Sequence, residues 1–149
     1  MKLTQKETTL LKDLKQGEKL CIKRYEKSSK EACSEPLKKL FTKLSLKETE
    51  HLNTINNIIK GKVPEVPAKK KSALKPKYDV SYNTKEKTQD AFLCEDSLSA
   101  EKHISSLYNT CIFEFTDVNL RNILNHIQKE EQEHGESLYD YMNQCGMYA

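Results

Sequence analysis

The chain has 149 residues and a formal net charge of +3 at pH 7, with 32% charged and 7% aromatic residues. This length suits one domain with a sizeable core, and the low content of Gly and Pro, four of each, favours helices over sheets. So mild a charge does not indicate nucleic-acid binding, and no apolar run is long enough to span a membrane.

Cysteine usage and the N-terminal stretch indicate the compartment of synthesis. The five cysteines stand singly, without a C-x-x-C pair, which favours reduced thiols. The first residues are charged throughout and contain no apolar signal core. We therefore expect synthesis in the cytoplasm.

Two helices are predicted at the start of the chain. Thr4 and Glu7 fit a capping box that opens the first helix, and Ser34 fits the N-cap of the second. Gly61 then fits a C-terminal cap. Together the two helices predict a first hairpin over residues 4–60.

Each of these helices carries residues at steps of three and four that share one face and predict its core side. A carboxylate interrupts each stripe, and a histidine also interrupts the second, where an apolar core would not accept them without a partner. The first stripe contains Leu11, Leu14, Glu18, Cys21 and Tyr25, and the second contains Leu37, Phe41, Leu44, Glu48, His51 or Leu52, Ile55 and Ile58.

A long connection over residues 61–86 follows, without helical periodicity and with Pro64, Pro67 and Pro76. Loops of this length are uncommon in compact domains, but ferritin-like bundles use a long crossover to join two antiparallel hairpins. The lysines of this linker form a solvated surface or, alternatively, contact an acidic partner. They are Lys69, Lys70, Lys71, Lys75 and Lys77.

The second hairpin is expected over residues 87–145. Its first helix should begin near Thr84 or Thr88, Asp117 fits the N-cap of the next helix, and Gly146 fits a C-terminal cap. The first stripe contains Cys94, Ser97 or Leu98, Glu101, Ile104, Tyr108, Cys111 or Ile112, and Phe115. The second contains Leu120, Leu124, Ile127, Glu131, His134, Leu138 and Tyr141.

Four helices with apolar stripes predict an all-α fold. We expect a single ferritin-like domain over residues 1–149, in which a four-helix bundle is made of two antiparallel hairpins joined by the crossover.

The two hairpins repeat one another at an offset of 83 residues. Glu18, Tyr25, Glu48 and His51 are separated by steps of 7, 23 and 3 residues, and the same steps recur in the second half. Apolar positions also pair at this offset without a gap. The four polar residues of the first half are matched in the second half by Glu101, Tyr108, Glu131 and His134.

This repeat predicts a metal site, because it places four Glu and two His at mid-height in the core. Buried carboxylates must be protonated or find cations, and no Lys or Arg lies on the stripes at that level. Two divalent ions, with one His each, would balance four carboxylates, and these donor types suit Fe or Mn, with Zn possible. The predicted ligands are Glu18, Glu48, His51, Glu101, Glu131 and His134.

Other polar residues near the stripes have two interpretations. Tyr25 and Tyr108 are either core tyrosines with a bonded hydroxyl, or they hydrogen-bond a ligand Glu or take a redox role. Cys21 fits a small core residue. His103 and His126 lie beside their stripes and are expected at the surface.

The paired E-x6-Y and E-x-x-H frame resembles the ferritin-like superfamily, especially the rubrerythrin and bacterioferritin bundles. More narrowly, the second half is similar to the spore coat F protein family of spore-forming bacteria over about residues 88–148. The segments that carry this resemblance are Ser99–Lys102, Ser106–Thr110, Asn119–Asn122, Glu130–His134, Tyr141–Gln144 and Gly146–Tyr148.

The resemblance implies a spore coat protein that binds a dinuclear metal, with the coat as location and other coat proteins as partners. It also implies that Glu48 and Glu131 bridge the two ions, while Glu18 and Glu101 are terminal ligands. The alternative is a small di-metal oxidase, peroxidase or ferroxidase that acts on peroxide, oxygen or Fe(II).

Assembly is a further expectation. Leu10, Ile22, Ile59 and Phe113 lie off or beside the inferred stripes. Apolar residues in such places predict a homodimer or a larger assembly.

Overall fold

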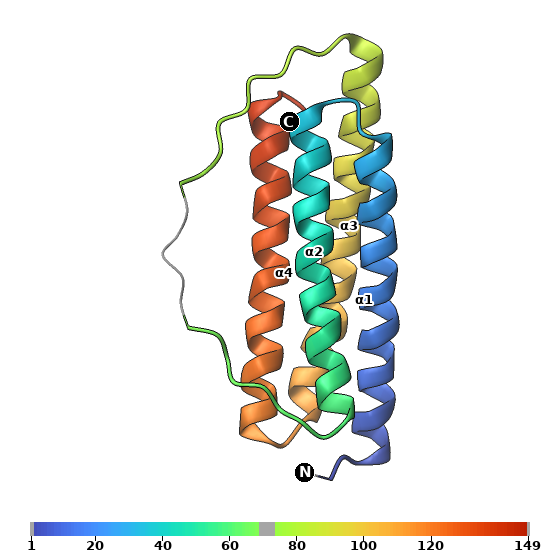
Figure 1. Ribbon diagram of the computed structural model, residues 1–149, viewed down its shortest axis with the longest axis vertical. Coiled ribbons are helices and arrows are strands. Elements are labelled where there is room, and N and C mark those ends of the chain that lie inside the picture. The colour runs from blue at the N-terminus through green and yellow to red at the C-terminus, as the bar shows by residue number, and fades with distance from the viewer. Residues whose placement is uncertain (1, 69–73, 149) are drawn as a thin grey trace.

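The computed structural model describes residues 2–68 and 74–148, and this part of the chain contains four helices and no strand. It confirms the predicted all-α four-helix bundle (Figure 1). The helices are α1 (Gln5–Glu31), α2 (Glu35–Ile59), α3 (Thr84–Glu114) and α4 (Val118–Gln144).

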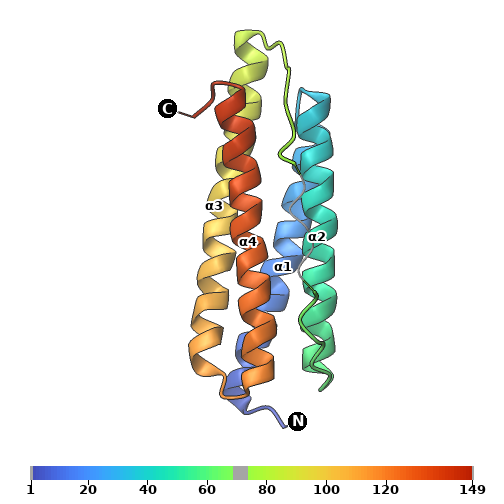
Figure 2. The same cartoon turned by 90° about the vertical axis from the view of Figure 1, so that its left-hand side faces the viewer.

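The bundle is made of two antiparallel hairpins, α1 with α2 and α3 with α4 (Figures 1 and 2). The crossover leaves the C-terminal end of α2 and returns along the length of the bundle, so that α2 and α3 run in the same direction. α1 also packs against α3, whereas α2 and α4 have the least contact of the neighbouring pairs. No helix in the described ranges is long and apolar enough to cross a membrane.

The helix ends follow the capping signals of the sequence. Thr4 Oγ1 accepts the Glu7 N–H at 3.1 Å, and the Glu7 carboxylate accepts the Thr4 N–H at 2.9 Å, which completes the predicted capping box. Ser34 and Asp117 are N-caps, also as predicted. α3 begins at Thr84 with Asn83 as its cap.

The apolar core consists of two clusters, one towards each end of the bundle. The first gathers around Leu14, Ile55 and Leu124, and the second around Phe41 and Leu138. Between these two levels lie the four Glu and two His singled out by the repeat. The hydrophobic clusters therefore hold the helices together above and below a polar layer at mid-height.

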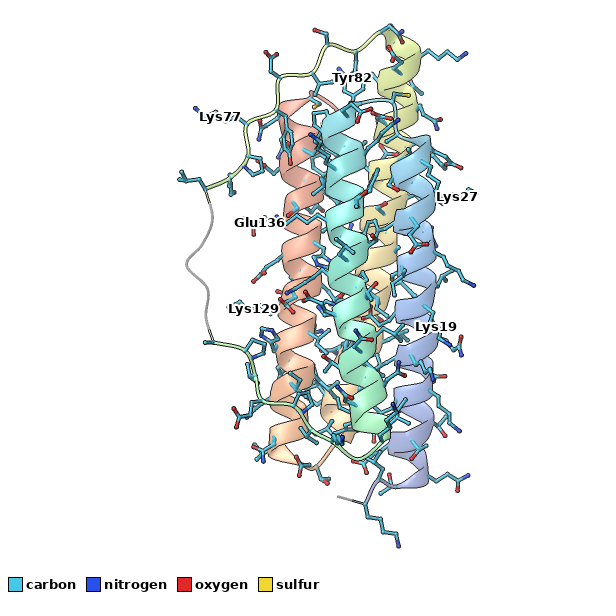
Figure 3. The ribbon with its side chains drawn as sticks, in the orientation of Figure 1. Lys19, Lys27, Lys77, Tyr82, Lys129 and Glu136 are labelled. Atoms are coloured by element: carbon cyan, nitrogen blue, oxygen red, sulfur yellow. The ribbon has the colours of Figure 1, made fainter. Side chains whose placement is uncertain are left out.

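A buried hydrogen-bond network ties the end of the crossover to the turn between α1 and α2. Asp90, fully buried on α3, accepts the N–H groups of Cys33 and Ser34 at 2.7 and 3.0 Å and the Tyr82 hydroxyl at 2.6 Å. Tyr82, labelled in Figure 3, also lies 2.5 Å from the Tyr141 hydroxyl. One carboxylate thus joins three separate segments of the chain.

The outer faces of the helices are charged. Lys19, Lys27 and Lys129 project away from the bundle in Figure 3. The crossover contacts α4 through Lys75, whose Nζ lies 3.3 Å from the Glu136 carboxylate. The predicted lysine run is only partly visible, since Lys69, Lys70 and Lys71 lie outside the described residues.

The apolar residues named for assembly have different surroundings. Leu10 and Ile59 pack, partly buried, against the first cluster of the core. Ile22 is half-buried, while Phe113 is 83% exposed. Assembly itself stays a prediction.

Replacing Asp90 by alanine should destabilise the protein by about 3 kcal/mol, because it leaves the buried Ser34 N–H and the part-buried Cys33 N–H without this acceptor. Chemical denaturation of the metal-free protein measures this change. The matched control is Asp96→Ala, which breaks a half-exposed ion pair with Arg24 and should cost less than about 1 kcal/mol. Equal losses in the two variants would contradict the role given to Asp90.

Candidate metal centre

The six predicted ligands come together at mid-height, and all four helices contribute. α1 supplies one Glu, α3 supplies another, and α2 and α4 each supply a Glu and a His one turn apart on the inner face. None of the six is more than 5% exposed. They are Glu18, Glu48, His51, Glu101, Glu131 and His134.

The histidines pair across the hairpins. His51 Nδ1 lies 2.6 Å from Glu131 Oε1, and His134 Nδ1 lies 2.7 Å from Glu48 Oε1. The two imidazole rings stack with centroids 5.7 Å apart. Each E-x-x-H histidine therefore faces the Glu of the other hairpin's motif.

The donor atoms form two overlapping groups, and within each group they all lie within 4.8 Å of one another. One group has Glu18 and His51 as its own members, and the other has Glu101 and His134. Both groups include Glu48 and Glu131. This is the grouping that two ions sharing two bridging carboxylates would require.

The tyrosines of the repeat bind the outer carboxylates reciprocally. Tyr25 donates from its hydroxyl to Glu101 Oε1 at 2.5 Å, and Tyr108 donates to Glu18 Oε1 at 2.7 Å. Each tyrosine therefore positions a carboxylate of the opposite hairpin. Burial, followed by the charge of that carboxylate, raises the pKa of both hydroxyls well above the ordinary value, so both remain donors.

Several atoms of the cluster have no hydrogen-bond partner among the described residues. The close His–Glu contacts lack hydrogen-bond geometry, so both carboxylate oxygens of Glu48 and Glu131 are unpaired although buried. One oxygen each of Glu18 and Glu101 and the Nδ1 atom of His51 are also unpaired. Buried polar atoms without partners are rare in folded proteins, and this donor set fits divalent cations.

Protonation alone can relieve only part of the repulsion between the carboxylates. Burial, followed by the proximity of other carboxylates, raises the pKa of Glu18 and Glu131 well above the ordinary value. Burial also acts to raise the pKa of Glu48, but contacts with Glu18 and His134 outweigh it and lower that pKa to about 2. Burial acts to lower the pKa of His134, but Glu101 and Glu48 raise it to about 9.

Glu130, to which the sequence pattern assigns no role, lies beside the cluster. Its carboxylate lies 3.1 Å from His51 Nε2, 2.8 Å from Lys47 Nζ and 3.2 Å from His126 Nε2. Positions 47 and 130 are equivalent in the repeat, and they carry opposite charges. Opposite charges at equivalent positions on facing helices were the signal that could have revealed this pair.

The remaining candidate residues lie around the cluster. Cys21 is buried in the first apolar cluster, and burial raises the pKa of its thiol. His103 is exposed, as predicted. His126, also expected at the surface, is only 23% exposed at its side chain because it pairs with Glu130.

The fold and the cluster define an all-α four-helix bundle protein with a buried carboxylate–histidine centre. The profile of the family described as the Coat F domain matches residues 89–149, which comprise most of α3 and all of α4. This match agrees with the resemblance carried by the motifs of the second half, and it supports the spore coat F family and a location in the spore coat. Neither the curated proteins nor the solved structures include a significant match.

Metal-free protein should lose stability as the pH rises from about 5 to about 9. Glu18, Glu131 and His134 all have a folded-state pKa above the ordinary value. A group whose pKa is raised in the folded state stabilises the fold fully at pH values below its unfolded-state pKa. This stabilisation is lost as the pH rises through the folded-state pKa. The lowered pKa of Glu48 acts in the opposite direction, but only in the acid range below about pH 4.5.

Urea denaturation of chelator-treated protein at several pH values measures this trend. Glu131→Gln, which removes one titrating group of the cluster, should make the dependence shallower. Stability that stays constant or increases over this range would contradict the assignment.

Proposed function

We propose that this coat protein binds two divalent metal ions at the centre of its bundle. One observation carries the proposal: the buried donor residues form two groups that share Glu48 and Glu131, and every member except His134 has at least one atom without a hydrogen-bond partner in the described ranges. Each group contains three carboxylates and one imidazole. Such oxygen and nitrogen donors suit Fe or Mn, and Zn is also acceptable.

The charges of the cluster support the same proposal. Two divalent ions would neutralise four carboxylates, and this would remove the need to protonate Glu18 and Glu131. Glu48 and Glu131 would bridge the ions, with Glu18 and His51 completing one position. Glu101 and His134 would complete the other, and Tyr25 and Tyr108 would hold the two outer carboxylates in place through their hydroxyl groups.

The proposed role of the metal is to bind the four helices to one another. Its ligands come from α1, α2, α3 and α4, so metal binding would stabilise the folded state by linkage. α2 and α4, which have the least contact of the neighbouring pairs, would gain an additional connection. A bundle stabilised in this way would suit a structural protein that assembles with other coat proteins, and the two antiparallel hairpins with their long crossover agree with a ferritin-like arrangement.

The alternative, a small di-metal oxidase, makes further demands. When bound, a pair of such ions can supply Lewis-acid or redox chemistry, but a catalyst also needs an open coordination position and a source of electrons. The contacts described above define the ligands and do not bear on either of these two requirements. We therefore propose metal binding without assigning an enzymatic reaction.

Glu131→Gln should have opposite effects with and without metal. In the loaded protein it should lower the metal content and the melting temperature, because a bridging ligand is lost. In the metal-free protein it should preserve or raise the melting temperature, because it relieves carboxylate repulsion in the core. Metal analysis combined with thermal unfolding measures both effects.

The matched control is Glu133→Gln, which removes the same charge from an exposed position two residues further along α4. This control should leave metal content and both melting temperatures unchanged. The proposal fails if wild-type protein binds no Fe, Mn or Zn, or if its stability does not respond to these ions.

A further inference from the structure

The two histidines of the cluster differ at the ring nitrogen that faces away from it. His51 Nε2 lies 3.1 Å from Glu130 Oε1, in hydrogen-bond contact. The same carboxylate binds Lys47 at 2.8 Å and His126 at 3.2 Å, so it is held from two further sides. His134 forms no corresponding contact through Nε2 with any residue in the described ranges.

This difference breaks the symmetry of the repeat. The ligands and the two tyrosines are the same in both halves, but Glu130 corresponds to Lys47. The carboxylate that supports His51 therefore has no equivalent beside His134. The two candidate ion positions have the same donor types but different surroundings.

The contact with Glu130 has a direct consequence for His51. An imidazole that donates from Nε2–H keeps its other nitrogen, Nδ1, free of a proton and available to a metal. Nδ1 is the atom that faces the cluster, 2.6 Å from Glu131. A carboxylate that accepts this hydrogen bond also makes the imidazole a more basic metal ligand. Loss of such a partner typically lowers metal affinity by about 10- to 100-fold.

We propose that Glu130 is a positioning residue that makes the two ion positions unequal. It strengthens binding at the position formed by Glu18 and His51, so that this position fills before the one formed by Glu101 and His134. The inference rests on the proposed dinuclear site and concerns how that site fills.

Titration with Mn²⁺ tests the proposal without an activity assay. Equilibrium dialysis gives the affinity of each equivalent, and electron paramagnetic resonance separates an isolated Mn²⁺ from a spin-coupled pair. Wild-type protein with one equivalent should show an isolated ion, and a second ion should bind about 10- to 100-fold more weakly. Glu130→Ala should weaken the first equivalent by this factor, so that the two affinities approach each other.

Three further variants identify the source of the effect. Glu130→Gln can still accept the His51 N–H without a charge, so the affinity of the first equivalent should lie between those of wild type and Glu130→Ala. Lys47→Gln removes the ion pair but leaves the contact with His51, so it should preserve the difference between the two equivalents. Glu133→Gln, an exposed charge change on the same helix, should leave both affinities as in wild type.

Ligand variants show which position fills first. Glu18→Gln should abolish the tight equivalent, whereas Glu101→Gln should abolish the weak one. The reverse pattern would overturn the assignment.

The outcomes separate this inference from the proposed function. If two equivalents bind with equal affinity, or if Glu130→Ala changes neither affinity, the inference is wrong and the dinuclear site stands. The inference also fails if Lys47→Gln equals Glu130→Ala, because the ion pair would then be the cause. Failure of wild-type protein to bind Mn²⁺, Fe²⁺ or Zn²⁺ overturns the proposed function, and the inference with it.

Discussion

The structure depends on the burial of four carboxylates and two imidazoles at one level of a four-helix core. Ionised carboxylates in such a place are very unfavourable unless protons, hydrogen bonds or cations compensate them. Two tyrosine hydroxyls and the two histidines compensate the cluster in part, and several buried oxygens have no hydrogen bond to any residue that the structure describes. The apolar clusters on both sides keep these groups away from water and so make the compensation necessary.

Most of the fold could be predicted because the signals were local and repeated. Apolar residues at steps of three and four indicated the inner faces, and Thr4, Ser34 and Asp117 marked three helix starts correctly. The offset of 83 residues then indicated which polar core positions are equivalent. Because Glu18 and Glu101 occupy such positions in two similar hairpins, their convergence could be expected before any contact was known.

The contacts that join distant segments could not be predicted in the same way. Asp90 reaches the turn before α2 across 56 residues of sequence, and periodicity shows only that it lies on an inner face. Glu130 differs from its repeat equivalent and was therefore left out of a pattern built on identity. Its partner His51 lies on another helix, so the pairing depends on the packing of α2 against α4. Such pairs follow from tertiary geometry, which the sequence pattern does not specify.

Anomalous X-ray diffraction from crystals grown with Mn²⁺ tests the central claim most directly, because it locates the ions without relying on affinity or stability measurements. We expect two peaks inside the bundle, both in contact with Glu48 and Glu131. One should also contact Glu18 and His51, and the other Glu101 and His134. A bundle interior without anomalous density, with the carboxylates bonded only to protein groups or water, would contradict it.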